Sequence, residues 1–148
     1  MPFQYHGSFV LHSAPHRGKT GPMLTTLPPF IQAAFREHAA KEHPKEACGL
    51  VVQLPGGALA FRACRNVHST PLDCFELAPE DWDQVEDEGE VIALLHSHPD
   101  APARPSLRDW AECAVMLIPW FILGQGNEWA HMDPSRVVFQ RSPEECSR

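Results

Sequence analysis

EVIALLHSH, at residues 90–98, is the stretch of sequence that decides the fold. This continuous apolar run is bounded by Gly89 and Pro99, is too short for most helices, and is rich in residues that favour strands. Such a run is typical of a strand that is buried on both faces at the centre of a sheet. We therefore expect a central strand whose end carries His96 and His98.

The segments before this strand predict a helix and a hairpin. From Phe30 to His43, apolar residues recur at three- and four-residue spacing, which predicts an amphipathic helix that packs on the sheet. Two β-rich runs, at 48–54 and 58–67, flank a Pro-Gly-Gly turn. We expect these two runs to pair as a hairpin.

The remaining segments complete the predicted architecture. The further elements that we expect are a short strand at 74–77, helices at 79–88 and 106–116, and strands at 120–124 and 136–141. Three helices mixed with strands, one hairpin and no strict alternation of strand and helix predict an α+β domain. Its sheet is expected to be mixed, largely antiparallel and flanked by helices.

The composition favours one domain and disfavours two classes of partner. The chain has 148 residues, of which 43% are hydrophobic, and a formal net charge of −7. Because nucleic-acid-binding proteins concentrate Lys and Arg on one face, we expect no nucleic acid partner. No apolar run is long enough to span a bilayer, so we expect no membrane partner. Five cysteines without a CxxC pair favour a reducing, cytoplasmic setting.

The composition also predicts where the domain begins and ends. Residues 1–22 mix His, Gly, Pro and basic residues without periodicity and lack the apolar core of a secretory signal, which predicts a flexible N-terminal tail. Residues 23–141 form the predicted domain, and residues 142–148 form a polar C-terminal tail.

His96 and His98 have the spacing of two metal ligands. Residues i and i+2 of a strand project from the same face, so both imidazoles can reach one ion. Zinc accepts imidazole nitrogens and carboxylate oxygens, and a hydrolytic zinc site needs three protein ligands. Asp109 is the candidate for the third ligand, because a Pro-rich loop folds the chain back over the strand end before the helix that carries this residue.

Each of these residues also has a structural interpretation. The segment from Ser106 to Asp109 resembles a capping box at the start of a helix, although Glu or Gln is the usual fourth residue. A single histidine on an apolar strand is more often a satisfied core or surface residue than a ligand. Glu46 is by itself consistent with an exposed carboxylate between a helix and a strand. Taken one at a time, the residues leave both interpretations open.

The whole pattern is more specific than its parts. His96-Ser97-His98, followed by Ser106 and Asp109, resembles the His-x-His-x(7)-Ser-x(2)-Asp motif of the JAMM (JAB1/MPN/Mov34) metallopeptidases. The resemblance covers about residues 24–141, and the stretch from 66 to 98 looks especially like the JAMM domain of phage tail assembly proteins of the lambda K type.

The resemblance implies a fold, a cofactor and a role for each site residue. The fold would be the cytidine-deaminase-like α+β architecture of JAMM/MPN domains, and the cofactor would be Zn²⁺. His96, His98 and Asp109 would bind the zinc. Glu46, in a PKEACG segment that matches the family's Glu position, would act as general base, and Ser106 would help to stabilise the oxyanion.

The function implied by this family is a zinc metallopeptidase or isopeptidase that hydrolyses an amide bond in a protein or peptide substrate, in phage or prophage tail assembly. Two alternatives stay open: processing of a ubiquitin-like sulfur-carrier protein, and a non-catalytic scaffold of the MPN type. We expect neither His68 nor His131 to be a ligand. Cys48, Cys64 and Cys74 are expected to act as small hydrophobic residues in or beside strands.

Overall fold

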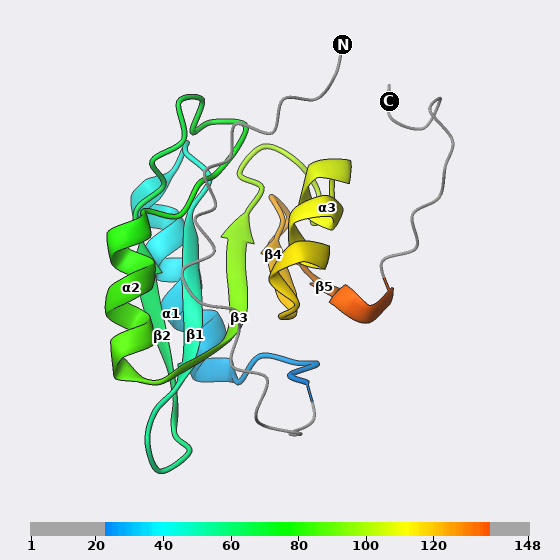
Figure 1. Cartoon of the computed structure of the whole chain (residues 1–148). Helices are drawn as coiled ribbons and strands as arrows, with labels where there is room; N and C mark the ends of the chain where they lie inside the picture. Colours follow the sequence, from blue (N-terminus) through cyan, green and yellow to red (C-terminus); the bar gives the residue numbers. More distant parts are fainter. Residues whose placement is uncertain (1–22, 137–148) are drawn as a thin grey trace.

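The computed structural model describes residues 23–136 (Figure 1). The predicted tails at 1–22 and 142–148 lie outside the described residues, as does the predicted strand at 136–141 apart from Arg136. The described elements, in chain order, are α1 (Pro29–Glu42), β1 (Cys48–Gln53), β2 (Leu59–Cys64), α2 (Pro79–Glu88), β3 (Glu90–Ser97), α3 (Leu107–Met116), β4 (Trp120–Leu123), β5 (Trp129–Met132) and the short 3-10 helix η1 (Pro134–Arg136).

The described strands form one five-stranded sheet in the order β2-β1-β3-β4-β5. β1 pairs with β2 as the predicted hairpin, and β3 lies in the centre, antiparallel to β1 and parallel to β4. β4 and β5 are antiparallel. Three antiparallel pairs and one parallel pair confirm the predicted mixed, largely antiparallel sheet and the α+β class.

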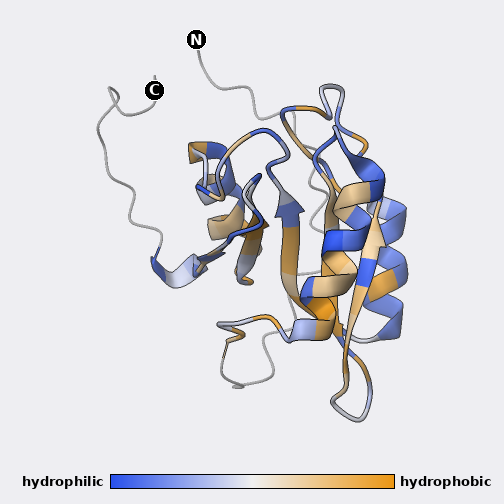
Figure 2. Cartoon of the chain, turned by 180° about the vertical axis from the view of Figure 1, so that it is seen from behind, coloured by the Kyte–Doolittle hydropathy of each residue, from blue (hydrophilic) through white to orange (hydrophobic). Residues whose placement is uncertain are grey.

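The helices cover both faces of the sheet. α1 lies on one face, whereas α2 and α3 lie on the other (Figure 1). Because side chains alternate along a strand, β3 sends Leu94 towards the α2 and α3 side and Leu95 towards α1. In Figure 2 the β3 arrow is apolar along its shaft and hydrophilic at its tip, so the central strand ends in polar residues.

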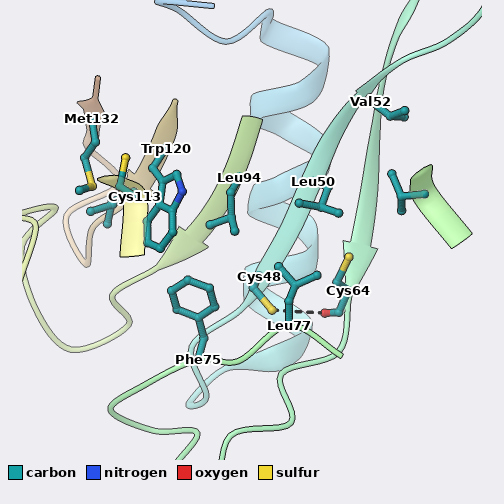
Figure 3. Packing of buried hydrophobic residues seen from close by; sticks show 12 residues of the cluster. Cys48, Leu50, Val52, Cys64, Phe75, Leu77, Leu94, Cys113, Trp120 and Met132 are labelled. Carbon is teal, nitrogen blue, oxygen red and sulfur yellow. Dashed lines mark hydrogen bonds between the residues drawn. The ribbon is translucent and has the colours of Figure 1, made fainter. Parts of the chain in front are cut away.

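Each face has its own apolar core. Under α1 the buried residues are Leu27, Ile31, Phe35, Ala47, Val51, Ala93, Leu95, Phe121 and Leu123. On the opposite face, Figure 3 shows strand side chains such as Leu50, Leu94 and Trp120 in a row, with Cys113 of α3 packed beside Trp120. Cys48 and Cys64 are buried within this second core, as free thiols. Within residues 23–136, no helix has the length and apolarity to cross a membrane.

The structure differs from the sequence-based expectations at one predicted strand and at one strand that was not predicted. The strand predicted at 74–77 is wrong: this segment makes an isolated bridge between Asn66 and Leu77. The reason is that the Asn66 side chain bonds the backbone of Cys74 and of Glu76, groups that a strand ladder would need. β5 was not predicted, although the turn that precedes it, at 125–127, carries a Gly-Asn pair typical of hairpins.

Candidate metal centre

The candidate site lies at the tip of β3, on the sheet face that carries α3. His96 is near the end of β3 and His98 follows it. The register that places Cys48 opposite His96 brings Glu46, two residues before β1, to the same tip. Asp109 is the third residue of α3, which returns over the tip after the loop at 98–106. The structure thus brings together four side chains that lie up to 63 residues apart in the sequence, between 46 and 109.

The four side chains meet through their polar atoms. The Nε2 atoms of His96 and His98 are 3.2 Å apart. The Asp109 carboxylate lies 3.3 Å from each of them, with Oδ1 near His96 and Oδ2 near His98. Oε1 of Glu46 is 3.8 Å from the His98 Nε2. Glu46, His96 and Asp109 are all buried, so little solvent screens these contacts.

This donor set fits a zinc ion. Ligands that lie about 2.0–2.1 Å from a tetrahedral zinc are about 3.3–3.4 Å from one another. The separations of 3.2 Å between the two imidazole nitrogens and 3.3 Å from each nitrogen to the Asp109 carboxylate match that spacing. Two neutral imidazole nitrogens that face each other at this distance repel through their lone pairs unless a cation or a proton lies between them. The geometry and the chemistry of the donors therefore agree.

Glu46 and Asp109 are both candidates for the third ligand. Glu46, His96 and His98 offer ligand atoms that all lie within 4.8 Å of one another. Asp109 is closer, because both of its oxygens contact an imidazole, whereas Glu46 reaches His98 alone at 3.8 Å. The shorter and more symmetric contacts favour Asp109 as the ligand and leave Glu46 beside the ion position.

The two histidines sit in different surroundings. His96 is fully buried between aromatic rings: Phe75 stacks on it with centroids 4.5 Å apart, and Trp120 meets it edge-on at 5.5 Å. Burial lowers its pKa, which keeps the ring neutral. Its Nδ1 has no hydrogen-bond partner within residues 23–136. Aromatic packing, instead of a hydrogen bond, therefore fixes the orientation of this ring.

The His98 ring is held by a hydrogen bond. Its Nδ1 lies 3.0 Å from the carbonyl oxygen of Pro102, which turns Nε2 towards the other donors. Partial burial opposes protonation of this ring, but the bonds to Asp109 and Pro102 outweigh it and raise the pKa of His98. The Pro-rich loop after β3 thus positions the His98 ring.

The two carboxylates have opposite pKa shifts. Burial raises the pKa of Glu46 to about 7, a value that suits a proton acceptor at neutral pH. Burial also opposes the ionisation of Asp109, but hydrogen bonds from His96 and His98 outweigh it and hold its pKa well below the usual range. An ionised Asp109 and a Glu46 poised to exchange a proton match a ligand and a base, respectively.

Ser106 and Asp109 form a capping box at the start of α3. The Ser106 N–H donates to Asp109 Oδ2 at 2.9 Å, and the Asp109 N–H donates to Ser106 Oγ at 3.0 Å. The cap therefore orients the Asp109 carboxylate towards the histidines. It uses Ser106 Oγ as an acceptor and leaves its hydroxyl hydrogen free to be donated elsewhere, so the role predicted for Ser106 stays a prediction.

Sequence reasoning missed the loop at 66–77 as part of the site. Its Phe75 ring covers His96, and its Pro71 carbonyl accepts a hydrogen bond from the Glu46 N–H at 2.8 Å. His68, which we expected not to be a ligand, contacts Arg108 of α3 through Nε2 at 3.1 Å. The available sequence signal was an asparagine before Pro71 and an aromatic residue between Pro71 and Pro79, which indicates a structured loop but does not specify its contacts.

A groove of about 210 Å³ adjoins the site. It lies between α1 and the turn from β4 to β5, and His98 forms part of its wall. Arg36 and His43 line it together with small residues such as Ala39 and Gly124. An extended chain in this groove would pass beside the His98 ring.

From its fold and its buried His-His-carboxylate set, the protein is an α+β domain with a candidate metal centre at the tip of its central strand. Residues 29–141 match the family described as prokaryotic homologs of the JAB domain. The chain belongs to this family, which confirms the resemblance that the His-x-His motif indicated.

Two similar proteins have descriptions that bear on function. The chain is 46% identical over 90 residues to the tail tip assembly protein K of Escherichia phage N15, a match that covers 61% of this chain and 37% of the phage protein. It is 34% identical over 126 residues to a probable TtuB-protein conjugate cleaving protease of Thermus thermophilus, covering 76% of this chain and 78% of that protein. The chain thus spans little more than a third of the phage protein's length.

A solved structure supports the fold. A protein from Desulfitobacterium hafniense, studied in solution, superposes with a TM-score of 0.56 over 73% of this chain and 81% of its own. The two sequences are 23% identical, so the likeness concerns the fold alone.

Proposed function

We propose that this protein is a zinc-dependent hydrolase that cleaves an amide bond in a protein substrate. The observation that carries the proposal is the convergence of two imidazoles and the Asp109 carboxylate at the spacing of zinc ligands, with Glu46 next to them. In this proposal His96, His98 and Asp109 hold the ion. Zinc bound there would supply Lewis-acid polarisation of a carbonyl group and would make nearby water more acidic.

The chain's own residues supply the proton transfers. Glu46, with a pKa near 7, accepts a proton from the attacking water and then delivers it to the leaving amine. Ser106, exposed at the start of α3, donates its hydroxyl hydrogen to the developing oxyanion while its oxygen keeps the cap on Asp109. The groove between α1 and the turn from β4 to β5 holds one side of the substrate chain beside His98.

Two substrate classes have support from different observations. The higher identity, 46%, is to a phage tail tip assembly protein, which favours a tail protein as substrate in a phage or prophage. The more complete match, 78% of the relative's length, is to a probable conjugate-cleaving protease, which favours a conjugate of a ubiquitin-like protein. A phage setting is our first proposal, and conjugate processing is the second.

Cleavage of defined substrates by the full chain tests the proposal. The zinc-loaded protein is incubated with phage tail proteins and, separately, with a TtuB-type conjugate, and the products are identified by mass spectrometry. We expect one substrate to be cleaved at an amide bond and a chelator to stop the reaction. Glu46→Gln should retain zinc and lose hydrolysis by roughly 10²–10⁴-fold.

The opposite results would count against the proposal. If the zinc-loaded protein binds these partners without cleaving either, the scaffold function replaces it. If Glu46→Gln cleaves as fast as the unaltered protein, Glu46 is not the base. If Glu46→Gln loses its zinc while Asp109→Asn keeps it, the two carboxylates exchange roles.

A further inference from the structure

The Asn66 side chain makes more polar contacts than a loop residue needs for its own turn. Its Nδ2 donates to the carbonyl oxygens of Glu46 and Cys74, each at 2.9 Å. Its Oδ1 accepts from the N–H groups of His68 and Glu76, each at 3.0 Å. A longer contact of 3.4 Å joins Nδ2 to the Pro71 carbonyl oxygen. Because Nδ2 meets only carbonyl oxygens and Oδ1 meets only N–H groups, the amide has one orientation that satisfies all five contacts.

These contacts connect Asn66 to the backbone of Glu46. Glu46 precedes β1, so its backbone groups lie outside the strand ladder. Its N–H donates to the carbonyl of Pro71 at 2.8 Å, and its carbonyl accepts from Asn66. The next residue, Ala47, is tied to the tip of β3 through Ser97. The loop at 66–77 therefore holds both backbone polar groups of Glu46, while the side chain of Glu46 points to the histidines.

The same loop also holds one of the histidines. Asn66 binds the backbone of Cys74 and of Glu76. Phe75, the residue between these two, stacks on the fully buried His96. Asn66 thus fixes the backbone on both sides of the residue that orients His96. A single amide connects the position of Glu46 to the position of the metal-ligand candidate His96.

We propose that Asn66 is a positioning residue that sets the distance between Glu46 and the histidine pair. This inference rests on the proposed function, because it assigns Asn66 to the reaction that Glu46 is proposed to carry out. Asn66 touches neither substrate nor ion and acts through the backbone of Glu46 and the loop that covers His96. Loss of its amide donors leaves Glu46 folded beside the site but displaced, and a displacement of about 1 Å can reduce the rate of a reaction by about 10²-fold.

Two substitutions at residue 66 separate the effect of losing the Asn66 hydrogen bonds from the effect of adding a negative charge. Asn66→Asp has the same shape, keeps the acceptors for His68 and Glu76, and loses the donors to Glu46 and Cys74. Asn66→Ala loses all five contacts without adding a charge. Gln32→Glu is the matched control: Gln32 also donates from a half-buried side-chain amide to a backbone carbonyl, that of Leu27, on the α1 side of the molecule.

Native-state amide hydrogen exchange on the full chain gives a readout that needs no substrate. We expect the Glu46 N–H to exchange at least about fivefold faster in Asn66→Asp and in Asn66→Ala, with unchanged exchange at Leu50 in the middle of β1. Gln32→Glu should leave the Glu46 exchange rate as it is. Unchanged Glu46 exchange in Asn66→Asp would overturn the proposal even if Asn66→Ala fails to fold.

Steady-state kinetics give the second readout. We expect kcat to fall by about 10- to 100-fold in Asn66→Asp, with KM within about twofold and with zinc still bound. A loss confined to KM, or a kcat equal to that of Gln32→Glu, would overturn the positioning role. If the unaltered protein carries zinc and hydrolyses nothing, the proposed function fails by itself, and the exchange of the Glu46 N–H still decides whether Asn66 positions this residue.

Discussion

The two faces of the sheet are built from the same strands and differ in what they bury. Under α1, the core is a continuous set of aliphatic and aromatic side chains around Phe35 and Leu95. On the α3 face, the row of apolar residues ends at the tip of β3 in His96, with Asp109 and Glu46 buried beside the histidine pair. Both faces bury an apolar core, and the α3 face also places charged groups where burial and hydrogen bonds alter their pKa values.

The difference shows how one strand serves both purposes. In β3 the residues that face α1 are Ala93 and Leu95, whereas those on the α3 side are Leu94 and His96. A rigid apolar layer behind the strand fixes the backbone from which His96 projects. Substitutions on the two faces should therefore change different measurements.

Asp109→Asn should have the largest effect. The amide keeps the shape of the side chain but loses the negative charge that contacts both imidazoles at 3.3 Å. We expect the protein to lose its zinc and its hydrolysis to fall below detection, with the fold retained, as measured by metal analysis and an activity assay. Asp133→Asn, at the exposed end of the described chain, is the control and should keep both. Full zinc content in Asp109→Asn would remove this residue from the ligand set.

Phe35→Ala should have the largest effect on stability. Phe35 is fully buried in the α1 core and contacts the rings of Phe61 and Trp129. Removing such a side chain costs about 3–5 kcal/mol of unfolding free energy, measured by denaturant titration. Phe30→Ala on the same helix is the control, because Phe30 is 59% exposed. Equal losses in the two variants would contradict the assignment of the core to this face.

Gly49→Ala should have an intermediate effect, again on the α1 side. A Cβ at Gly49 would lie 2.5 Å from Cε2 of Phe61 and 2.7 Å from the carbonyl oxygen of Arg62. Such crowding costs about 1–3 kcal/mol. Thermal unfolding should detect the loss, and Phe61→Leu in the same chain should recover part of it. A stable single variant would show that β2 can move away from β1 at no cost.

Asp81→Asn should have the smallest effect, at the solvent-exposed edge of the α2 side. Asp81 accepts hydrogen bonds from the Arg65 N–H at 2.8 Å and from its guanidinium. Partial burial opposes ionisation, but these bonds outweigh it and lower the pKa of Asp81. Because the folded pKa is the lower one, the contribution to stability is present above the unfolded pKa of about 3.9 and is lost as pH falls. We expect a small loss of stability at pH 7 that shrinks as the pH falls below the unfolded pKa of about 3.9, and a loss of the same size in acid would contradict the ionic origin.

The sequence predicted most of the elements, because their periodicities are local. The apolar run at 90–98 indicated a buried central strand, which the structure has as β3. The segment of α2 begins with a proline and acidic residues, which favour the start of a helix, and this helix is confirmed. The strand at 74–77 was wrong because a side chain 8 to 10 residues away, that of Asn66, takes its backbone groups. Local propensity contains no information about such a contact.

Only the part of the site whose residues have a characteristic spacing in the sequence was predictable from local patterns. His96, His98 and Asp109 could be grouped from strand alternation and a helix that follows the Pro-rich loop. The distance from Glu46 to His98 depends on the pairing of β1 with β3, which no local pattern specifies. The packing of Phe75 on His96 likewise depends on the loop at 66–77 and could not be seen before the fold was known.

The metal and its ligands are the central claim, and a crystallographic anomalous map at the zinc edge tests it most directly. We expect one zinc peak at about 2.0–2.1 Å from Nε2 of His96, Nε2 of His98 and the Asp109 carboxylate, with Glu46 outside bonding distance. The His96→Ala/His98→Ala double variant should then contain no zinc. A purified protein without a zinc peak at this position, or a double variant that retains one zinc per chain, would contradict the assignment.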